Sequence, residues 1–243
     1  MTEPPFMGTK VTDDISMCDI EPLIDREMLF SSRWQFRKGM KKNEWEDLKA
    51  SKVLPIYERI VAKCRAKDII IPRIAYGYFK CRNSEVHLFV EGERKTYKFD
   101  FPRERVVPHR CIADLFSGGI AAFQIVTVGE GVNKEAVRLF KNDAYSDSFY
   151  LKGFAAEAAE ALASLNHRKI RKELGASDDH GERFSPGYPS FPDLLDQRKV
   201  VELLDAKRIG VSLTKTCMFI PEHSTSAIIS VDPKAMHFNP NIS

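Results

Sequence analysis

The chain contains one segment unlike the rest, Arg183-Phe184-Ser185-Pro186-Gly187-Tyr188-Pro189-Ser190-Phe191-Pro192-Asp193. Its three prolines recur at a spacing of three, and each proline fixes its own φ angle and lacks a backbone donor. A helix or a central strand is therefore excluded, and the segment predicts an extended path similar to polyproline II. Such a path is stiff before a ligand arrives, so little conformational entropy is lost on binding.

Composition alone favours a plainer interpretation of this segment, as a proline-rich linker or a ligand for an SH3-type domain. Its position argues against that interpretation. The segment lies between a long predicted helix and another helical stretch, within a chain whose patterns indicate one domain.

The overall composition indicates a soluble globular protein. The chain has 243 residues, of which 43% are hydrophobic and 29% are charged, enough to bury a sizeable core. A net charge of +3 is too small to indicate nucleic-acid binding. The five cysteines are scattered and form no Cys-x-x-Cys pair, which is typical of reduced thiols. We find no signal-peptide pattern and no apolar run of membrane-spanning length, so we expect a cytoplasmic protein without membrane contact.

Polar residues dominate the N-terminus. Residues 1–18 predict a flexible arm, and residues 19–243 predict a single domain. The first helix is expected over Ile20–Phe30. A second is expected from about Glu44 to Cys64, where Pro55 should kink or split it.

The hydrophobic period then changes to two. Apolar residues alternate over 86–90 and again over 97–101, and the polar stretch 91–94 separates these runs. This pattern predicts a β-hairpin of antiparallel strands with one covered face. Further strands are expected over 69–81 and 120–128.

The longest predicted helix, from about Ser148 to Leu174, is apolar on two sides. One side carries large residues, and the other carries the small residues Gly153, Ala156 and Ala163. Glu160 lies on the second side, where its carboxylate is either partly buried or, as is usual for a helical glutamate, solvated.

Other motifs give no catalytic or metal site. Residues 126–131 imitate the glycine loop of nucleotide-binding folds, but the third glycine is missing and a tight turn is favoured. The six histidines show no metal-ligand spacing, and no Gly-x-Ser-x-Gly elbow supports a serine nucleophile.

The proline segment resembles the reactivation domain of cobalamin-dependent methionine synthase. It is the most specific part of a likeness that covers residues 19–233. Further motifs follow in the family's order: Leu23-Ile24-Asp25, Phe30, Trp34, Gly77-Tyr78-Phe79, Cys111-Ile112-Ala113-Asp114, Ile120-Ala121-Ala122-Phe123, Ala159-Glu160-Ala161, Glu202-Leu203-Leu204, Ile209-Gly210-Val211-Ser212-Leu213-Thr214 and Pro221.

The resemblance implies a fold and a function. The fold is α+β, with a twisted antiparallel sheet flanked by helices. The implied function is to bind S-adenosylmethionine and remethylate cobalamin that has been oxidised to inactive cob(II)alamin, after a flavodoxin- or ferredoxin-type donor supplies an electron. That chemistry is of the methyltransferase type and requires a corrinoid partner.

The resemblance also assigns S-adenosylmethionine-binding residues. Arg183 matches the arginine that holds the carboxylate, and Asp25 matches the aspartate that takes the ammonium. Glu160 matches a further acid, and Ser185 matches a position whose backbone meets the adenine. The remaining expected binding residues are Gly187, Tyr188, His237 and Phe238.

Some positions depart from the family pattern. A family tyrosine corresponds to His237, and a family acid corresponds to Lys215. These departures leave an alternative open. The chain would then be a non-catalytic adaptor or binding protein for a corrinoid methyltransferase, and it would have lost the ability to bind S-adenosylmethionine. A methyltransferase that acts on small molecules is less favoured, because no general base is identifiable.

The chain shows no cobalamin module and no substrate module. We therefore expect the corrinoid to come from a separate corrinoid-binding protein or a split methionine synthase, on which this chain would act in trans.

Overall fold

The computed structural model describes residues 2–37 and 39–240. The first residue of the predicted arm and the last three of the predicted domain lie outside this range. Within it, no helix is both long and apolar enough to cross a membrane.

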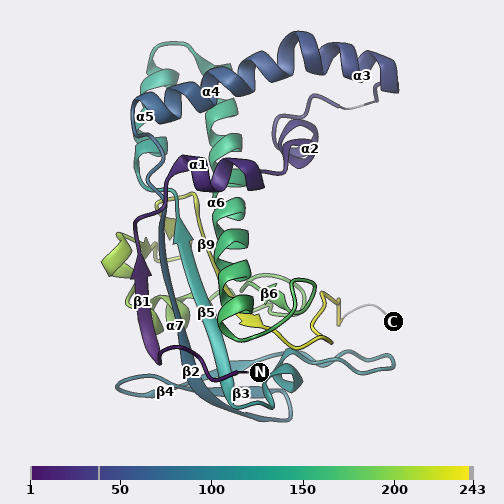
Figure 1. Cartoon of the computed structure of the whole chain (residues 1–243), viewed down its shortest axis with the longest axis vertical. Coiled ribbons are helices and arrows are strands. Elements are labelled where there is room, and N and C mark those ends of the chain that lie inside the picture. The colour runs from purple at the N-terminus through teal and green to yellow at the C-terminus, as the bar shows by residue number, and fades with distance from the viewer. Residues whose placement is uncertain (1, 38, 241–243) are drawn as a thin grey trace.

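An antiparallel sheet forms the centre of the fold (Figure 1). Among the described residues it has seven strands in the order β4-β3-β2-β5-β9-β6, and β1 also pairs with β2. The strands of this sheet are β1 (Gly8–Thr12), β2 (Arg73–Ser84), β3 (His87–Glu91), β4 (Thr96–Asp100), β5 (Ile120–Thr127), β6 (Glu182–Phe184) and β9 (Ser224–Ser230). A separate small ribbon pairs β7 (Ser212–Leu213) with β8 (Phe219–Ile220). The predicted α+β class with an antiparallel sheet is confirmed.

Helices flank this sheet. They are α1 (Met17–Ile20), α2 (Arg26–Met28), α3 (Lys42–Leu48), α4 (Leu54–Ala66), α5 (Gly131–Lys141), α6 (Tyr145–Glu173) and α7 (Asp196–Leu203). Short 3₁₀ turns cover Glu21–Leu23, Ile112–Phe116 and Ala206–Ile209, and π-helical stretches cover Leu29–Arg33 and Lys49–Val53.

Strand β5 is covered on both faces. Alternate residues such as Ala122 and Val126 pack in the cluster beneath α6, whereas Phe123 and Ile125 pack in a second cluster that includes Val200 of α7. The expectation of one covered face holds for the hairpin β3–β4, whose residues alternate between buried and accessible positions. Strand β5, for which no covered face was predicted, has helices against both of its faces.

The N-terminal residues are part of the sheet. Strand β1 pairs antiparallel with β2, and Phe6 packs edge-on against the rings of Tyr76 and Tyr78. The prediction of a flexible arm over residues 1–18 is therefore wrong for β1. The polar side chains of this strand do not prevent its pairing, because β1 lies at an edge of the sheet, where polar side chains are tolerated.

Both helices predicted near the N-terminus are interrupted. The one predicted over Ile20–Phe30 breaks at Ile24, whose ψ is 123°, and Asp25 then caps α2 by accepting a backbone hydrogen bond of 2.9 Å. In the second, the π-helical stretch Lys49–Val53 immediately precedes α4. The α-helical pattern is thus interrupted just before Pro55, which has no N–H to donate within a regular α-helix, but the run from Lys42 to Ala66 stays helical and is not split into two pieces.

The proline segment is folded rather than extended. Its backbone makes turns after β6, and the N–H of Gly187 donates to the carbonyl of Phe191 at 2.8 Å. The N–H of Phe191 donates to the carbonyl of Tyr188, also at 2.8 Å. Phe191 is fully buried, with its ring centroid 4.8 Å from that of Phe101. The polyproline II prediction is therefore wrong. The two backbone hydrogen bonds and the burial of Phe191 stabilise the turns more than they would an extended path.

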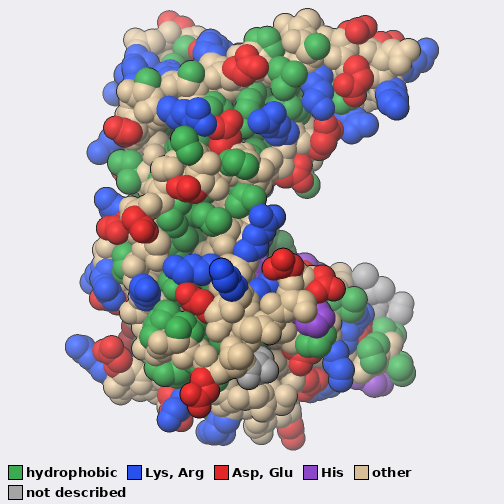
Figure 2. Space-filling view, viewed as in Figure 1, with side chains coloured by type: hydrophobic (Ala, Val, Ile, Leu, Met, Phe, Trp, Pro, Cys, Tyr) green, Lys and Arg blue, Asp and Glu red, His purple; other side chains and the backbone are tan. Residues whose placement is uncertain are grey.

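One side of the molecule is hollowed. Figure 2 shows this hollow between the end of the molecule that carries α2 and α3 and the end that carries β6. Helix α6 runs along its inner wall and connects the two ends (Figure 1).

We expect Gly77→Ala to release β1 from the sheet. A Cβ atom on Gly77 would lie 2.1 Å from the carbonyl oxygen of Gly8, so one of the two strands must move. Strand β1 should move, because β2 is held by β5 on its other side. Hydrogen exchange of the Gly8–Thr12 amides should accelerate by at least about tenfold. Lys10→Ala, which alters only an exposed side chain of β1, should retain the wild-type protection. Unchanged exchange in Gly77→Ala would contradict the expectation.

Candidate functional site

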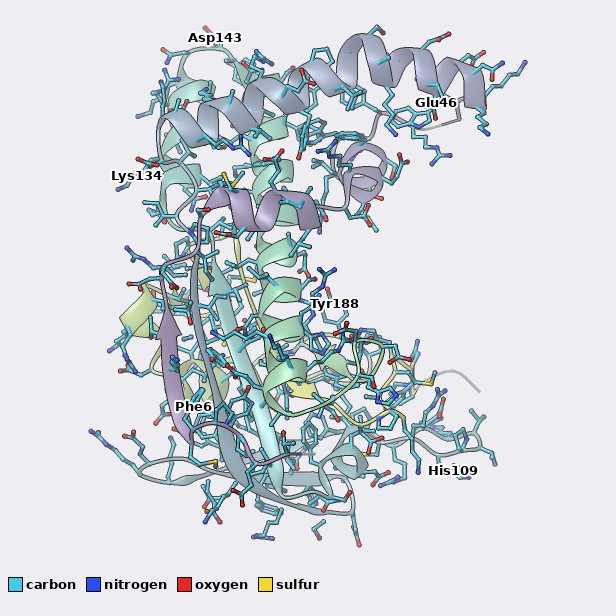
Figure 3. All side chains as sticks on the ribbon, in the orientation of Figure 1. Phe6, Glu46, His109, Lys134, Asp143 and Tyr188 are labelled. Atoms are coloured by element: carbon cyan, nitrogen blue, oxygen red, sulfur yellow. The ribbon has the colours of Figure 1, made fainter. Side chains whose placement is uncertain are left out.

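A cavity of about 140 Å³ lies between α6 and the end of the sheet formed by β5, β9 and β6. Tyr188 stands beside α6 at the border of the hollow (Figure 3). The lining residues are Gln124, Glu160, Glu182, Arg183, Ser185, Tyr188, Thr225, Ala227 and His237. The structure thus brings together predicted binding residues that are distant in the sequence: Glu160, Arg183, Ser185, Tyr188 and His237.

Strand alternation directs Arg183 into this cavity. Arg183 is paired with Ile229, which packs in the cluster beneath α6, whereas Phe184 belongs to the cluster on the other face. Its Nη2 atom lies 3.5 Å from Glu160 Oε2 and 3.4 Å from Ser164 Oγ, both on α6. Both contacts are long, so the guanidinium is positioned by them without being tightly held.

The loop that leads into β6 is fastened to α6. Arg171 donates from Nε to the carbonyl of His180 at 2.5 Å and from Nη2 to that of Gly181 at 3.0 Å. Gly181 has a φ of +86°, and a Cβ there would lie 2.3 Å from the carbonyl oxygen of Ser230. The start of β6, and with it Arg183, is therefore fixed by both α6 and β9.

The turns of the proline segment form one border of the cavity. Ser185 follows β6 directly and lines the cavity, and Tyr188 is 60% exposed at its mouth. Gly187 is not part of the lining. Its φ of +94° instead allows the chain to turn back.

The C-terminal segment forms another border. The ring of His237 lies against Phe184, with centroids 5.6 Å apart, and its Nε2 is 3.5 Å from Glu182 Oε1. Phe238 is outside the cavity lining, packs on the second core cluster and lies 5.4 Å from the Arg110 guanidinium carbon.

Asp25 is also outside the cavity lining, but it lies close enough to α6 to affect a carboxylate there. Burial raises the pKa of Glu157, and the charges of Glu160 and Asp25 raise it further. Arg33 opposes this effect by donating from Nε to Glu157 Oε1 at 2.7 Å. A row of acids therefore follows one side of α6, from Asp25 beside Glu157 to Glu160 in the cavity.

Four lining residues were not among the predicted binding residues: Gln124, Glu182, Thr225 and Ala227. Gln124 could have been found, because it is an amide within the otherwise apolar run 120–126. Thr225 and Ala227 carry no such signal. They reach the cavity only because β9 pairs with β5.

These residues define a small polar binding site. The cavity offers a cation, carboxylates, an amide and an aromatic ring at its mouth. Within the described residues, no group of three or more His, Cys, Asp or Glu side chains could hold a metal ion. The fold and cavity together define an α+β domain with a ligand cleft between its sheet and one long helix.

Residues 16–241 match the family described as "Vitamin B12 dependent methionine synthase, activation domain". Because this match covers most of the chain, the chain belongs to that family, and the sequence resemblance is confirmed.

Two curated relatives are methionine synthases. The chain is 32% identical to methionine synthase of Mycobacterium tuberculosis and 29% identical to that of Mycobacterium leprae, with 97% of the chain covered in each case. It spans 23% of the length of each relative. The likeness therefore concerns one part of these longer proteins.

A solved structure has the same fold. The crystal structure of the MetH reactivation domain bound to AdoHcy matches with a TM-score of 0.84 at 20% identity, covering 98% of this chain and 82% of that one.

We expect His167 to reduce stability in acid. Burial and the charges of Arg171 and Arg183 lower the pKa of this α6 side chain from 6.5 to about 3. Between these values the unfolded state binds the proton more readily, so the free energy of unfolding should decrease as the pH falls. Between pH 6 and pH 4 the wild type should lose roughly 1 kcal/mol per pH unit more than His167→Gln.

Urea denaturation at several pH values measures this difference. His180→Gln, which changes a histidine in a loop, should keep the wild-type slope. Parallel slopes for the wild type and His167→Gln would contradict the expectation.

Proposed function

We propose that this chain binds S-adenosylmethionine in the cavity beside α6. There it supports the reductive methylation of cob(II)alamin on a separate corrinoid-binding protein or a split methionine synthase. The observation that carries the proposal is the meeting of Arg183 and Glu160, 3.5 Å apart, in one cavity with Tyr188 at its mouth.

The chemistry requires an electron and a methyl group. A flavodoxin- or ferredoxin-type donor supplies one electron to cob(II)alamin, and the resulting cob(I)alamin takes the methyl group of S-adenosylmethionine. The bond between the sulfonium sulfur and the methyl carbon breaks. Its electron pair stays on sulfur, and the product is S-adenosylhomocysteine. The role of this chain is to bind and orient the methyl donor.

The charges of the cavity suit an α-amino acid. Arg183 is assigned to the carboxylate, which its planar fork can bind with two hydrogen bonds. Glu160 is assigned to the ammonium, with Asp25 adding negative charge from outside the lining. Tyr188 presents an aromatic face to the sulfonium. The backbone of Ser185 is assigned to the adenine.

The size of the cavity determines which part of the ligand enters. Sites that enclose drug-sized ligands measure about 300–1,000 Å³, whereas this cavity measures about 140 Å³. We assign the amino-acid end to the interior of the cavity and the adenosine to its mouth, along Ser185 and Tyr188 and facing the hollow. The methyl group would then face the hollow, where a corrinoid could approach.

The solved relative supports this assignment of ligand. AdoHcy, to which the MetH reactivation domain is bound in its crystal structure, is S-adenosylhomocysteine, which differs from S-adenosylmethionine only by the transferred methyl group and its charge.

An adaptor that has lost this ligand is the second candidate. Two internal contacts favour it, because Glu160 forms an ion pair with Arg183 and the Nε2 atom of His237 lies 3.5 Å from Glu182 Oε1. Capture of a corrinoid partner that is unaffected by S-adenosylmethionine, combined with no binding in calorimetry, would favour the adaptor.

We expect Arg183→Ala to weaken binding of S-adenosylmethionine by at least about 100-fold, because a charged hydrogen-bonded pair is lost. Isothermal titration calorimetry measures the change. Lys215→Ala is the matched control, since Lys215 lies outside the cavity lining. Equal losses in the two variants would refute the carboxylate assignment, and absence of binding to the wild type, alone or with a corrinoid partner, would refute the proposed function.

The methyl transfer can be followed directly. S-adenosylmethionine labelled on its methyl group, a corrinoid protein holding cob(II)alamin and reduced flavodoxin should give labelled cobalamin when the wild-type chain is present. Arg183→Ala should abolish the transfer at micromolar S-adenosylmethionine. Labelling at the same rate without the chain would contradict the assigned role.

A further inference from the structure

Gln124 is a buried amide at the inner side of the cavity. It lies in the middle of β5, is 1% exposed and is among the cavity-lining residues. Its partner on the neighbouring strand β9 is Ala227, whose small side chain also lines the cavity and leaves space in front of the amide. Apart from Thr127 at its end, the other residues of β5 are apolar, and an amide buried among apolar residues is costly unless it has hydrogen-bond partners.

Two contacts with α6 orient this amide. Asn166 Nδ2 donates to Gln124 Oε1 at 2.8 Å, and Gln124 Nε2 donates to the carbonyl oxygen of Ala163 at 3.3 Å. Together they determine which end of the amide is oxygen and which is nitrogen. The Nε2 group carries two hydrogens. One of them is donated to the Ala163 carbonyl, and no described residue accepts the other.

Asn166, which contacts this amide, and His167, which follows it on α6, also carry buried polar atoms. Asn166 Oδ1 and His167 Nε2 have no hydrogen-bond partner among the described residues. Asn166 is 1% exposed and His167 is 5% exposed. Unpaired buried groups of this kind are rare in native structures and call for a ligand, an ion or water. Neither residue lines the cavity, so these atoms belong to the polar interior beside α6 and are not themselves contacts for a ligand in the cavity.

We propose that Gln124 is a specificity-determining residue of this cavity, which donates its second Nε2 hydrogen to the ligand carboxylate that Arg183 also binds. This inference rests on the proposed function and adds a residue to it. Gln124 contributes a hydrogen bond without a net charge. It therefore distinguishes a ligand that has an acceptor at this position from one that lacks it, by leaving a buried donor unpaired in the second case.

The experiment compares two ligands by calorimetry. S-adenosylmethionine has the carboxylate, and decarboxylated S-adenosylmethionine lacks it but keeps the ammonium and the sulfonium. Gln124→Leu should lower the affinity for S-adenosylmethionine by about 10- to 100-fold. It should lower the affinity for the decarboxylated ligand by less than about threefold. Gln124→Glu should lower the affinity for S-adenosylmethionine further, because the new glutamate carboxylate would repel the carboxylate of the ligand or pair with Arg183 in its place.

Controls separate a binding role from a structural one. Gln197→Leu replaces another buried glutamine, on α7 at the opposite face of the sheet, and should leave both affinities unchanged. If Gln124→Leu does not fold, Gln124→Leu combined with Asn166→Leu removes both members of the polar pair and is measured in its place, with thermal unfolding to verify the fold.

The outcomes are distinct. Unchanged affinity of the variant for S-adenosylmethionine, or equal losses for the two ligands, would overturn the role of Gln124 while the proposed function stands. Absence of S-adenosylmethionine binding in the wild type would instead overturn the proposed function. A loss confined to the ligand that has the carboxylate would support the assignment.

Discussion

The close approach of α6 to its neighbours is the constraint on which the rest of the structure depends. Small side chains make this approach possible. A Cβ atom on Gly153 would lie 2.8 Å from the Trp34 ring, whose Nε1 donates to the Tyr150 carbonyl at 2.9 Å. Further along the helix, Ala159 and Ala163 are buried. Because it packs so closely, one rigid helix joins the N-terminal helices at one end to the cavity at the other.

The same helix organises the cavity. It contributes Glu160 to the lining, holds the loop before β6 through Arg171 and orients Gln124 through Asn166. Gln124 on β5 and Arg183 on β6 therefore meet Glu160 because both contact α6, so these three groups stand on regular elements, whereas Ser185, Tyr188 and His237 lie outside helices and strands. Rigid elements hold binding groups more accurately than loops do.

The sequence predicts the elements of this fold well where the pattern is long and regular. The hairpin, the long helix and the strand over 120–128 are all present, because periodic burial determines them. Prediction fails where a tertiary contact decides. The residues of β1 have no strong strand pattern and become a strand by pairing with β2. The prolines of 186–192 suggest an extended path, but burial of Phe191 draws the segment into turns. In the site, Arg183 and Tyr188 come from a recognisable motif, whereas Thr225 lines the cavity only through strand pairing.

The ion pair between Arg183 and Glu160 already places opposite charges together in the cavity, beside the second carboxylate of Glu182. A zwitterionic amino-acid group that enters exchanges one set of opposite charges for another, so the local net charge does not change. Ionic strength consequently has little influence on this part of the binding free energy, because salt screens long-range fields far more than contacts within a partly buried pair. The proposed binding of the amino-acid group and the proposed docking of a protein partner through exposed charges would therefore respond differently to salt concentration.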